Sequence, residues 1–390
     1  MRAGEAMRFE LATAGRILFG AGAVREVRPA AQEIGRRVLL VTGRSPERAA
    51  GLRDDLVAAG MACSLFTVAG EPSLDLVRQG TEQARREQSE MVISFGGGSA
   101  IDAGKAIAAL LTNRGGVTDY LEVIGKGQPL GAAPAPFIAI PTTAGTGSEV
   151  TRNAVLSSPE HRVKVSLRSP RMLAALAVID PELTLGLPPA ITASTGLDAL
   201  TQLIEPYVSS RANPVTDGFC LEGLRRVSHS LERAYRDGSD IEARSDMSLA
   251  SLLGGLALAN SGLGVVHGFA GPVGGMFSAA HGAICAALLP HGMETNIRAL
   301  RARAPTSEPL KRYEQIAGLL TGKAEARAED GVLWVRRLCQ QLKVSPLRSY
   351  GVREQDFPSL AAKASKASSM KGNPIALTED ELHSMLARAL

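Results

Sequence analysis

The sequence contains little cysteine and little net charge. Lys and Arg number 43 against 39 Asp and Glu, so the formal net charge is only +4. We therefore expect no basic surface of the kind that binds nucleic acid. The cysteines lie far apart and form no C-x-x-C pair, which argues against a zinc ribbon or a dithiol redox motif and predicts reduced, packed thiols. The four are Cys63, Cys220, Cys285 and Cys339.

The sequence also lacks a recognisable targeting segment. No basic patch followed by an apolar run of signal-peptide length stands at its beginning, and we expect a cytoplasmic protein that does not enter a membrane. One stretch, residues 247–266, carries no charge over 20 residues, a length that spans a bilayer. It stands alone and contains four glycines and several polar residues. We therefore predict that it forms a buried helix of a helical bundle.

Length and composition indicate a globular protein with two domains. Of its 390 residues, 45% are apolar and 21% charged, and one hydrophobic core seldom serves so long a chain. In residues 1–184, apolar runs alternate with helical patterns, which predicts a parallel, Rossmann-like sheet covered on both faces. The expected strands are residues 16–19, 38–42, 63–68, 91–95 and 137–140, and the expected helices are residues 24–34, 46–59, 74–87 and 99–111.

The pattern changes in a proline-bounded connector at residues 183–189. Beyond it the sequence shows helical periodicity and almost no strand pattern, so residues 185–390 are predicted to form an all-helical domain. Ligand sites prefer the junction between two such domains. The expected helices include residues 190–209, 214–235, 241–260, 267–277 and 281–300.

A glycine loop, residues 96–99, follows the fourth expected strand and opens a helix. Its three glycines let backbone N–H groups approach a phosphate closely, and the helix N-terminus adds unpaired donors and partial positive charge. The alternative is a simple turn in which Ser99 caps the helix. The spacing matches neither G-x-G-x-x-G nor a P-loop. We interpret the loop as a diphosphate site formed by Gly97, Gly98, Ser99 and Asp102.

A threonine loop, residues 142–148, follows the next strand. It is rich in hydroxyls and contains two glycines. Such a loop can hydrogen-bond to a ribose, a phosphate or a base edge, although turns favour hydroxyl residues in general. The side chains expected to contact a cofactor are Thr142, Thr143, Thr146 and Ser148.

The helical half holds a set of residues typical of a metal site. Asp198 and Gln202 are four residues apart and share one helix face. His267 and His281 each open an expected helix. A carboxylate and two imidazoles suit zinc or ferrous iron with an open position for substrate. The alternative is that both histidines are packed or exposed residues without a ligand role.

Several long motifs, in the right order, resemble the iron-containing (group III) alcohol dehydrogenase family. They cover nearly the whole chain, which is thereby expected to share the dehydroquinate synthase-like arrangement of a dinucleotide-binding domain and a helical domain. The motifs are ILFGAG at 17–22, GGGSAID at 96–102, IPTTAGTGSEVT at 140–151, DPELT at 180–184, TGLDAL at 195–200, the segment from His267 to His281, and LPH at 289–291.

The resemblance implies a metal-dependent, nicotinamide-dependent alcohol dehydrogenase or aldehyde reductase. It implies that the glycine loop cradles the cofactor, that Lys164 lies near it, and that Fe²⁺ or Zn²⁺ is held by Asp198, His267, His281 and the residue at position 202. In most members that position is histidine, whereas here Gln202 offers a poorer amide oxygen. The resemblance also implies a homodimer acting on a small alcohol or aldehyde.

Two further positions bear on substrate and cofactor. Gly271 replaces a histidine that many members carry, and this change predicts a wider substrate pocket. NAD-preferring dehydrogenases often place an acid after the second strand, where this chain has Gly43, Arg44 and Ser45. Arg44 is able to pair with a 2′-phosphate, so we expect NADP in preference to NAD; the alternative is that Arg44 merely faces solvent.

Two alternative functions remain open from the sequence. A metal-independent enzyme similar to the maleylacetate reductases shares this fold, and loss of activity on chelation would count against it. A lyase similar to dehydroquinate synthase requires several basic residues around a sugar phosphate, and the segments near Asp198 and His267 supply few. We assign the hydride-transfer chemistry to Asp198, His267 and His281, acting through a bound metal.

Overall fold

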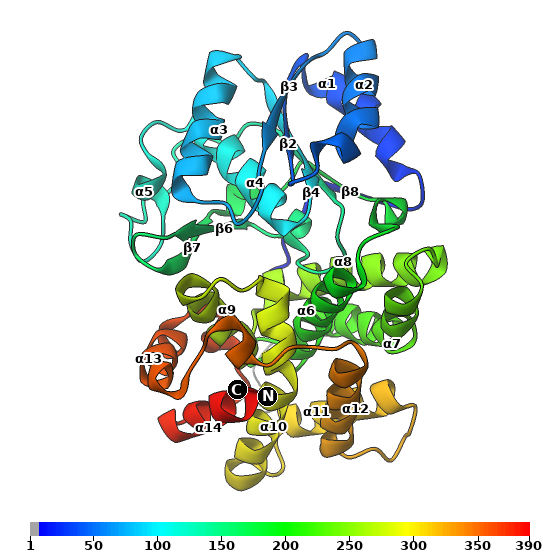
Figure 1. Cartoon of the computed structure of the whole chain (residues 1–390), viewed down its shortest axis with the longest axis vertical. Helices are drawn as coiled ribbons and strands as arrows, with labels where there is room; N and C mark the ends of the chain where they lie inside the picture. Colours follow the sequence, from blue (N-terminus) through cyan, green and yellow to red (C-terminus); the bar gives the residue numbers. More distant parts are fainter. Residues whose placement is uncertain (1–7) are drawn as a thin grey trace.

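The computed structural model describes residues 8–390 and consists of an α/β half followed by an all-helical half (Figure 1). The α/β half is built on a six-stranded sheet in the order β1-β8-β5-β4-β2-β3, with every pair parallel. The fold class predicted from the sequence is therefore confirmed. The strands are β1 (Arg16–Phe19), β2 (Arg37–Thr42), β3 (Ala62–Thr67), β4 (Met91–Gly96), β5 (Phe137–Pro141) and β8 (Leu176–Ile179).

Helices cover both faces of this sheet, which explains why its central strands are apolar throughout. Alternate residues of β2 belong to the hydrophobic cores on opposite faces of the sheet. Val38 and Leu40 pack with α1 and α2, whereas Leu39 and Val41 pack with α3 and α4. All residues of β4 and β5 are buried. The helices of this half are α1 (Val27–Ile34), α2 (Ala50–Ala58), α3 (Leu74–Arg86), α4 (Gly98–Thr112) and α5 (Val117–Tyr120).

The sequence analysis missed an antiparallel hairpin and the strand β8. The hairpin consists of β6 (Asn153–Ser158) and β7 (Val163–Arg168), and forms a separate two-stranded sheet. Its residues alternate between buried and partly exposed positions in β6, as expected for a strand with one covered face. β6 packs on α4 and β7 packs on α9, so the hairpin connects the two halves of the molecule.

The helical half begins at Pro189, after the last strand ends at Ile179. The division at residue 184 lies between these two points and stays a prediction. The first five helices match the expected segments to within three residues at each end. The helices are α6 (Pro189–Val208), α7 (Pro214–Arg236), α8 (Ile241–Ser261), α9 (Val265–Met276), α10 (His281–Arg303), α11 (Glu308–Thr321), α12 (Ala328–Gln341), α13 (Phe357–Lys366) and α14 (Glu379–Ala389).

The uncharged stretch at residues 247–266 falls on α8 and the start of α9, and most of it is buried in the protein core. Among residues 8–390, no single helix is both long and apolar enough to cross a bilayer. Only α8 and α9 taken together meet those criteria, and the chain bends by 98° between them.

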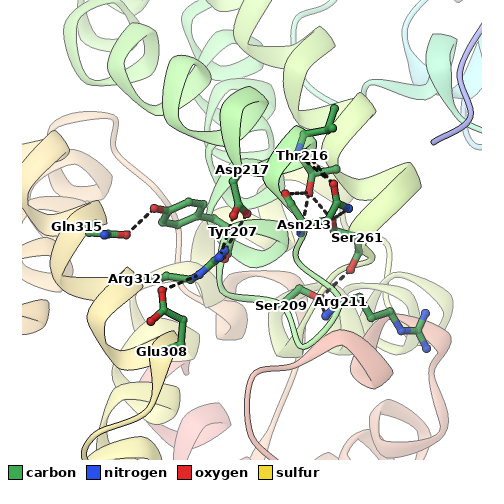
Figure 2. A network of polar contacts seen from close by, with 11 residues as sticks. Tyr207, Ser209, Arg211, Asn213, Thr216, Asp217, Ser261, Glu308, Arg312 and Gln315 are labelled. Atoms are coloured by element: carbon green, nitrogen blue, oxygen red, sulfur yellow. Dashed lines mark hydrogen bonds and ion pairs between the residues drawn. The ribbon is translucent and has the colours of Figure 1, made fainter. Parts of the chain in front are cut away.

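A polar network links α6, which carries part of the site described below, to three neighbouring helices (Figure 2). Arg312 on α11 makes two bonds to the carboxylate of Asp217 on α7, at 2.7 and 2.8 Å, and donates to the carbonyl of Tyr207 at 2.7 Å. Nearby, Asn213 caps α7 and donates to Ser261 at the end of α8. Such paired, charge-assisted bonds are directional, and here they hold α6, α7, α8 and α11 in one arrangement.

Candidate active site

A group of four potential metal ligands lies where α6, α9 and α10 meet, with three of its members buried and His281 partly exposed. The ligand atoms of Asp198, His267, His281 and Cys285 all lie within 4.8 Å of one another. Oδ1 of Asp198 is 3.4 Å from Nε2 of His267 and 3.7 Å from Nε2 of His281. The structure therefore brings together the carboxylate and both imidazoles that the sequence analysis selected.

Close packing of α10 on α6 makes this meeting possible. At Gly282, next to His281, a Cβ atom would lie only 2.5 Å from the carbonyl oxygen of Ser194 on α6, and 3.4 Å from Cβ of Asp198. Only a residue without a side chain permits this approach. Asp198 stands on the buried face of α6, with 1% of its side chain exposed.

Unpartnered oxygen atoms show that the group fits a cation. Oδ1 of Asp198 and Oε1 of Gln202 are buried and have no hydrogen-bond partner among the described residues. A buried carboxylate oxygen without a partner is costly, and a divalent cation ligated by it removes that cost. Oε1 of Gln202 would lie 3.6 Å from a Cβ atom on Gly254 of α8. Ligation by Gln202 stays a prediction.

Glu205, which the sequence analysis missed, orients His267. Its Oε2 lies 2.8 Å from Nδ1 of His267, and its Oε1 accepts the backbone N–H of Val266 at 2.7 Å. Only 5% of the Glu205 side chain is exposed. A carboxylate bound to Nδ1 fixes the proton there and leaves Nε2 free to ligate a metal. The signal was present in the sequence, because Glu205 follows Asp198 by seven residues and so shares its helix face.

Burial and the mutual contacts of the charged side chains shift the pKa values of the metal-ligand residues. Burial acts to raise the pKa of Asp198, but His281 and His267 outweigh it and hold that pKa below its usual value. Burial acts to lower the pKa of His267, but Cys285, Asp198 and Glu205 outweigh it and hold the pKa well above its usual value. Burial lowers the pKa of His281, and the nearby charge of Asp198 offsets only part of this decrease. The ionised Asp198 and the raised pKa of His267 favour positive charge beside these two residues, whereas burial disfavours it on His281.

Cys285 is the member of the metal-ligand group that the sequence analysis missed. It lies on α10 one turn after His281 and is completely buried. Its Sγ is 3.8 Å from Nε2 of His267 and 3.7 Å from Nε2 of His281. Burial raises the pKa of this thiol to about 12. A coordinated metal ion reverses that preference and deprotonates a thiol outright.

The expected cofactor loops gather at one edge of the parallel sheet. Residues 43–45 follow β2, the glycine loop follows β4 and the threonine loop follows β5, and these three strands are neighbours. The connection after β2 leads to β3 on one side, and the connection after β4 leads to β5 on the other, so the strand order reverses between β2 and β4 while all strands stay parallel. In open α/β sheets, ligands bind beyond the carboxyl ends of the strands at such a switch point.

The glycine loop and the threonine loop touch one another. Cβ atoms placed on Gly97 and Gly98 would lie 3.3 Å from Oγ1 of Thr143 and 2.7 Å from Cγ2 of Thr146. The helix α4 begins directly at this contact, with Gly97 at its N-cap. The alternative in which Ser99 caps the helix is therefore wrong, and the helix N-terminus stays accessible to an anion through backbone N–H groups.

Asp102, Ser148 and Lys105 lock the two loops together. Ser148 Oγ donates to Oδ1 of Asp102, whose Oδ2 accepts the N–H of Val155 at 3.0 Å. The Lys105 ammonium is 1% exposed and donates to the Ser148 carbonyl at 2.7 Å and to Thr151 at 3.0 Å. Burial lowers the pKa of Lys105 to about 8. These side chains brace the loops, and a direct contact of Asp102 or Ser148 with a cofactor stays a prediction.

The threonine loop also packs directly on the helical half. A Cβ atom on Gly147 would lie 2.4 Å from Cα of Gly255 on α8, so the two backbones meet without side chains between them. Gly147 has a φ of 59°, in the left-handed region that glycine favours. The expected cofactor loop is therefore held against the domain that carries the metal ligands.

Lys164 reaches the same junction from the hairpin. Its side chain is 4% exposed and its Nζ lies 2.9 Å from Oε1 of Glu71. A Cβ atom on Gly274 of α9 would lie 3.1 Å from the same Nζ, and the charge of Lys164 contributes to the lowered pKa of His281. Lys164 thus places a positive charge between the sheet edge and the metal-ligand group.

Gly271 opens a space beside the metal-ligand group. It lies on α9 one turn after His267, and a Cβ atom added there would meet nothing within 4 Å. A side chain at this position would therefore extend into unfilled space. This observation agrees with the wider pocket predicted from the sequence.

Comparison with curated proteins finds alcohol dehydrogenases over most or all of the chain. Alcohol dehydrogenase 4 of Saccharomyces cerevisiae is 39% identical over 319 residues, which are 82% of this chain and 80% of the yeast protein. The 1,3-propanediol dehydrogenase of Klebsiella pneumoniae is 36% identical over 382 residues, 95% and 96% of the two chains. The NAD-dependent methanol dehydrogenase of Bacillus methanolicus is 33% identical over 384 residues, 96% and 97% of the two chains.

Solved structures and family models agree with these relatives. The crystal structure of a 1,3-propanediol oxidoreductase superimposes with a TM-score of 0.89 at 35% identity and covers 98% of this chain and 100% of that one. Residues 14–181 match the model of iron-containing alcohol dehydrogenases, and residues 192–390 match that of the C-terminal part of the same family. The chain therefore belongs to the iron-containing alcohol dehydrogenase family and is an oxidoreductase that acts on the CH–OH group of its donors.

Proposed function

We propose that this alcohol dehydrogenase holds one Fe²⁺ or Zn²⁺ ion on Asp198, His267 and His281, and binds a nicotinamide dinucleotide across the carboxyl ends of β2, β4 and β5. The observation that carries the proposal is the unpartnered, buried Oδ1 of Asp198, which faces the Nε2 atoms of both histidines. When bound, the metal supplies Lewis-acid stabilisation of negative charge on the substrate oxygen, and the nicotinamide supplies the hydride.

The protein contributes position and charge to this reaction. Glu205 sets the tautomer of His267, so that Nε2 presents a lone pair. Asp198 supplies a negative charge that remains ionised, because His281 and His267 hold its pKa down. Lys164 places a cation at the junction, where it attracts an anionic part of the cofactor. The glycine loop offers backbone donors at the N-terminus of α4 for a diphosphate.

The space beside Gly271 favours substrates larger than the smallest alcohols. Nothing within residues 8–390 comes within 4 Å of a Cβ atom at this position, which lies one helical turn from His267. We propose that this alcohol dehydrogenase accepts branched or longer aldehydes. The homodimer expected from the family resemblance is a further prediction, which sedimentation equilibrium tests.

The decisive experiment measures metal and activity together. The protein is purified anaerobically, its metal content is measured by elemental analysis, and oxidation of NADPH and NADH is followed with a panel of aldehydes before and after chelation. We expect about one iron or zinc per chain, with activity lost on chelation and restored by added metal. Full activity in protein free of metal would refute the proposed site and favour a metal-independent reductase.

We also propose that the cofactor preference leans to NADP(H), through Arg44. No carboxylate follows β2 to repel a 2′-phosphate. Arg44 is exposed, and its Nε donates to the carbonyl of Ala69 at 3.0 Å, which ties the guanidinium to the loop after the neighbouring strand β3. Arg44→Ala is expected to raise KM for NADPH and leave KM for NADH unchanged, whereas Arg53→Ala, on the outside of α2, changes neither. An equal effect on both cofactors would contradict this assignment.

A further inference from the structure

The metal-ligand group contains a thiol to which neither the sequence analysis nor the proposed function gives a role. Cys285 is 0% exposed, and its Sγ lies among the three residues proposed to hold the metal. We infer that the Cys285 thiolate is the fourth protein ligand of the metal. This inference rests on the proposed function, because it requires a metal on Asp198, His267 and His281.

Four of the six distances between the ligand atoms match those expected around a tetrahedral metal, and all six are below 4.8 Å. Bond lengths of about 2.1 Å to nitrogen or oxygen and about 2.3 Å to sulfur place ligand atoms about 3.4 Å apart for nitrogen and oxygen and about 3.6 Å apart for sulfur and nitrogen. The observed separations are 3.4 and 3.7 Å from Oδ1 of Asp198 to the two imidazoles, and 3.8 and 3.7 Å from Sγ of Cys285 to the same two nitrogens.

Backbone geometry explains why the Cys285 thiol faces Asp198 and the two histidines. His281 and Cys285 are four residues apart on α10, so their side chains project from the same face of the helix. That face looks toward α6 and α9, which carry Asp198 and His267. The approach of α10 to α6 at Gly282 brings the beginning of this face, and with it both side chains, to the carboxylate.

The other buried cysteines show what a packed thiol looks like in this chain. Sγ of Cys339 on α12 donates to the carbonyl of Ala286 at 3.7 Å, a backbone contact inside the helical core. Cys220 on α7 is likewise buried in that core. Neither belongs to a metal-ligand group among the described residues. Cys285 differs because its neighbours are a carboxylate oxygen without a partner and two imidazole nitrogens.

A thiolate is also a stronger ligand than the amide at position 202. Zinc and ferrous iron prefer imidazole and thiolate to a neutral carbonyl oxygen. With Cys285 the site has one carboxylate, two imidazoles and one thiolate, which completes four-coordination without Gln202. Binding replaces the S–H bond with a metal–sulfur bond and releases one proton to the solvent, with no change of oxidation state. With the metal bound, a substrate oxygen would be a fifth ligand, an expansion that catalytic zinc sites allow.

Reconstitution with Co²⁺ tests the inference without reference to turnover. The protein is freed of metal by chelation and titrated anaerobically with Co²⁺, while visible and near-ultraviolet absorption are recorded. Visible ligand-field bands report any bound Co²⁺, whereas an intense sulfur-to-cobalt charge-transfer band in the near ultraviolet requires a thiolate ligand. The same titration is run on Cys285→Ala, on Gln202→Ala, and on Cys339→Ala as the matched control for loss of a buried thiol.

We expect one Co²⁺ per chain and a charge-transfer band in the wild-type protein, in Gln202→Ala and in Cys339→Ala. In Cys285→Ala the band is lost while the visible bands remain. The Kd for the metal rises at least tenfold, since loss of a mere supporting group costs about 10- to 100-fold. X-ray absorption of the zinc-loaded wild type is expected to show one sulfur at about 2.3 Å, a measurement that needs no variant to fold.

The outcomes separate this inference from the proposed function. One Co²⁺ per chain without a charge-transfer band, or a band that persists in Cys285→Ala, would overturn the role of Cys285 and leave the metal on Asp198, His267 and His281. Loss of the band in Gln202→Ala with its retention in Cys285→Ala would also overturn it. Failure of the wild-type protein to bind Co²⁺ or Zn²⁺ at all would overturn the metal site and the inference together.

Discussion

Replacement of Glu205 by glutamine is expected to weaken metal binding while it preserves the shape of the side chain. Each of the two carboxylate oxygens accepts one hydrogen bond, Oε1 from the N–H of Val266 at 2.7 Å and Oε2 from Nδ1 of His267 at 2.8 Å. An amide has only one accepting oxygen. If that oxygen keeps the Val266 N–H, the NH₂ group faces Nδ1 and donates to it, which moves the imidazole proton to Nε2 and removes the lone pair that ligates the metal.

The expected loss of metal affinity follows from the role of Glu205 as the carboxylate that supports a ligating histidine. Loss of the carboxylate that supports a ligating histidine costs about 10- to 100-fold in metal affinity, or about 1.4 to 2.8 kcal/mol. Glu205→Ala loses the same support and also leaves the buried N–H of Val266 unpaired, which costs about 1–3 kcal/mol of folding stability. Glutamine is therefore expected to reduce metal affinity with a smaller loss of stability than alanine.

Competition with a chromophoric chelator measures Kd for Zn²⁺ in both variants, and chemical denaturation of the metal-free proteins measures stability. Glu294→Gln is the control, because Glu294 lies on the same helix as His281 but pairs with Arg298 and Arg336. The reasoning is refuted if Glu205→Gln keeps the wild-type Kd, since the carboxylate would then not determine which nitrogen of His267 carries the proton.

Three further predictions concern packing and pH. Gly271→His is expected to fill the space beside His267 and to lower kcat/KM for branched aldehydes about tenfold or more, with acetaldehyde unaffected; an equal loss for both would contradict a pocket-filling effect. Gly282→Ala places a Cβ atom 2.5 Å from the Ser194 carbonyl and is expected to lower both metal content and stability, by about 1–3 kcal/mol for the latter. Gly218→Ala, at an exposed helical position with open space, is its neutral control. Burial lowers the pKa of His291 from 6.5 to about 4, so the unfolded chain binds the proton first and stability falls as pH decreases from 6.5 toward 4. His291→Gln is expected to flatten this decline in denaturation curves, and an unchanged slope would contradict the prediction.

The sequence was sufficient for the fold because its local signals were strong and agreed with one another. Apolar runs followed by glycine or hydroxyl-rich loops predicted β2, β4 and β5 and the loops at their carboxyl ends. The helices of the second half carry clear periodicity and proline or asparagine at their starts, as in α7, where Asn213 caps the helix. The β6–β7 hairpin was missed although each of its strands has six residues, as many as β2 and β4. Polar and charged residues interrupt its apolar positions, so no continuous apolar run marks either strand.

The site was only partly predictable, because sequence spacing places a residue on a helix face but does not say what that face meets. Asp198, His267 and His281 were selected by residue type and by family resemblance. Glu205 and Cys285 lie at helical spacing from Asp198 and His281, and nothing in one sequence shows that these faces converge. That convergence depends on the bend of 98° between α8 and α9 and on the approach of α10 to α6 at Gly282.

All proposed metal ligands lie on α6, α9 and α10, whereas the glycine loop belongs to the α/β half. Ligand binding stabilises whatever folded unit makes the contacts, by an amount that grows with ligand concentration over Kd. Saturating metal should therefore raise the melting temperature of the helical half, and saturating cofactor that of the α/β half. Because no described residue of the α/β half belongs to the metal-ligand group, the helical half is able to acquire its metal before any nucleotide binds.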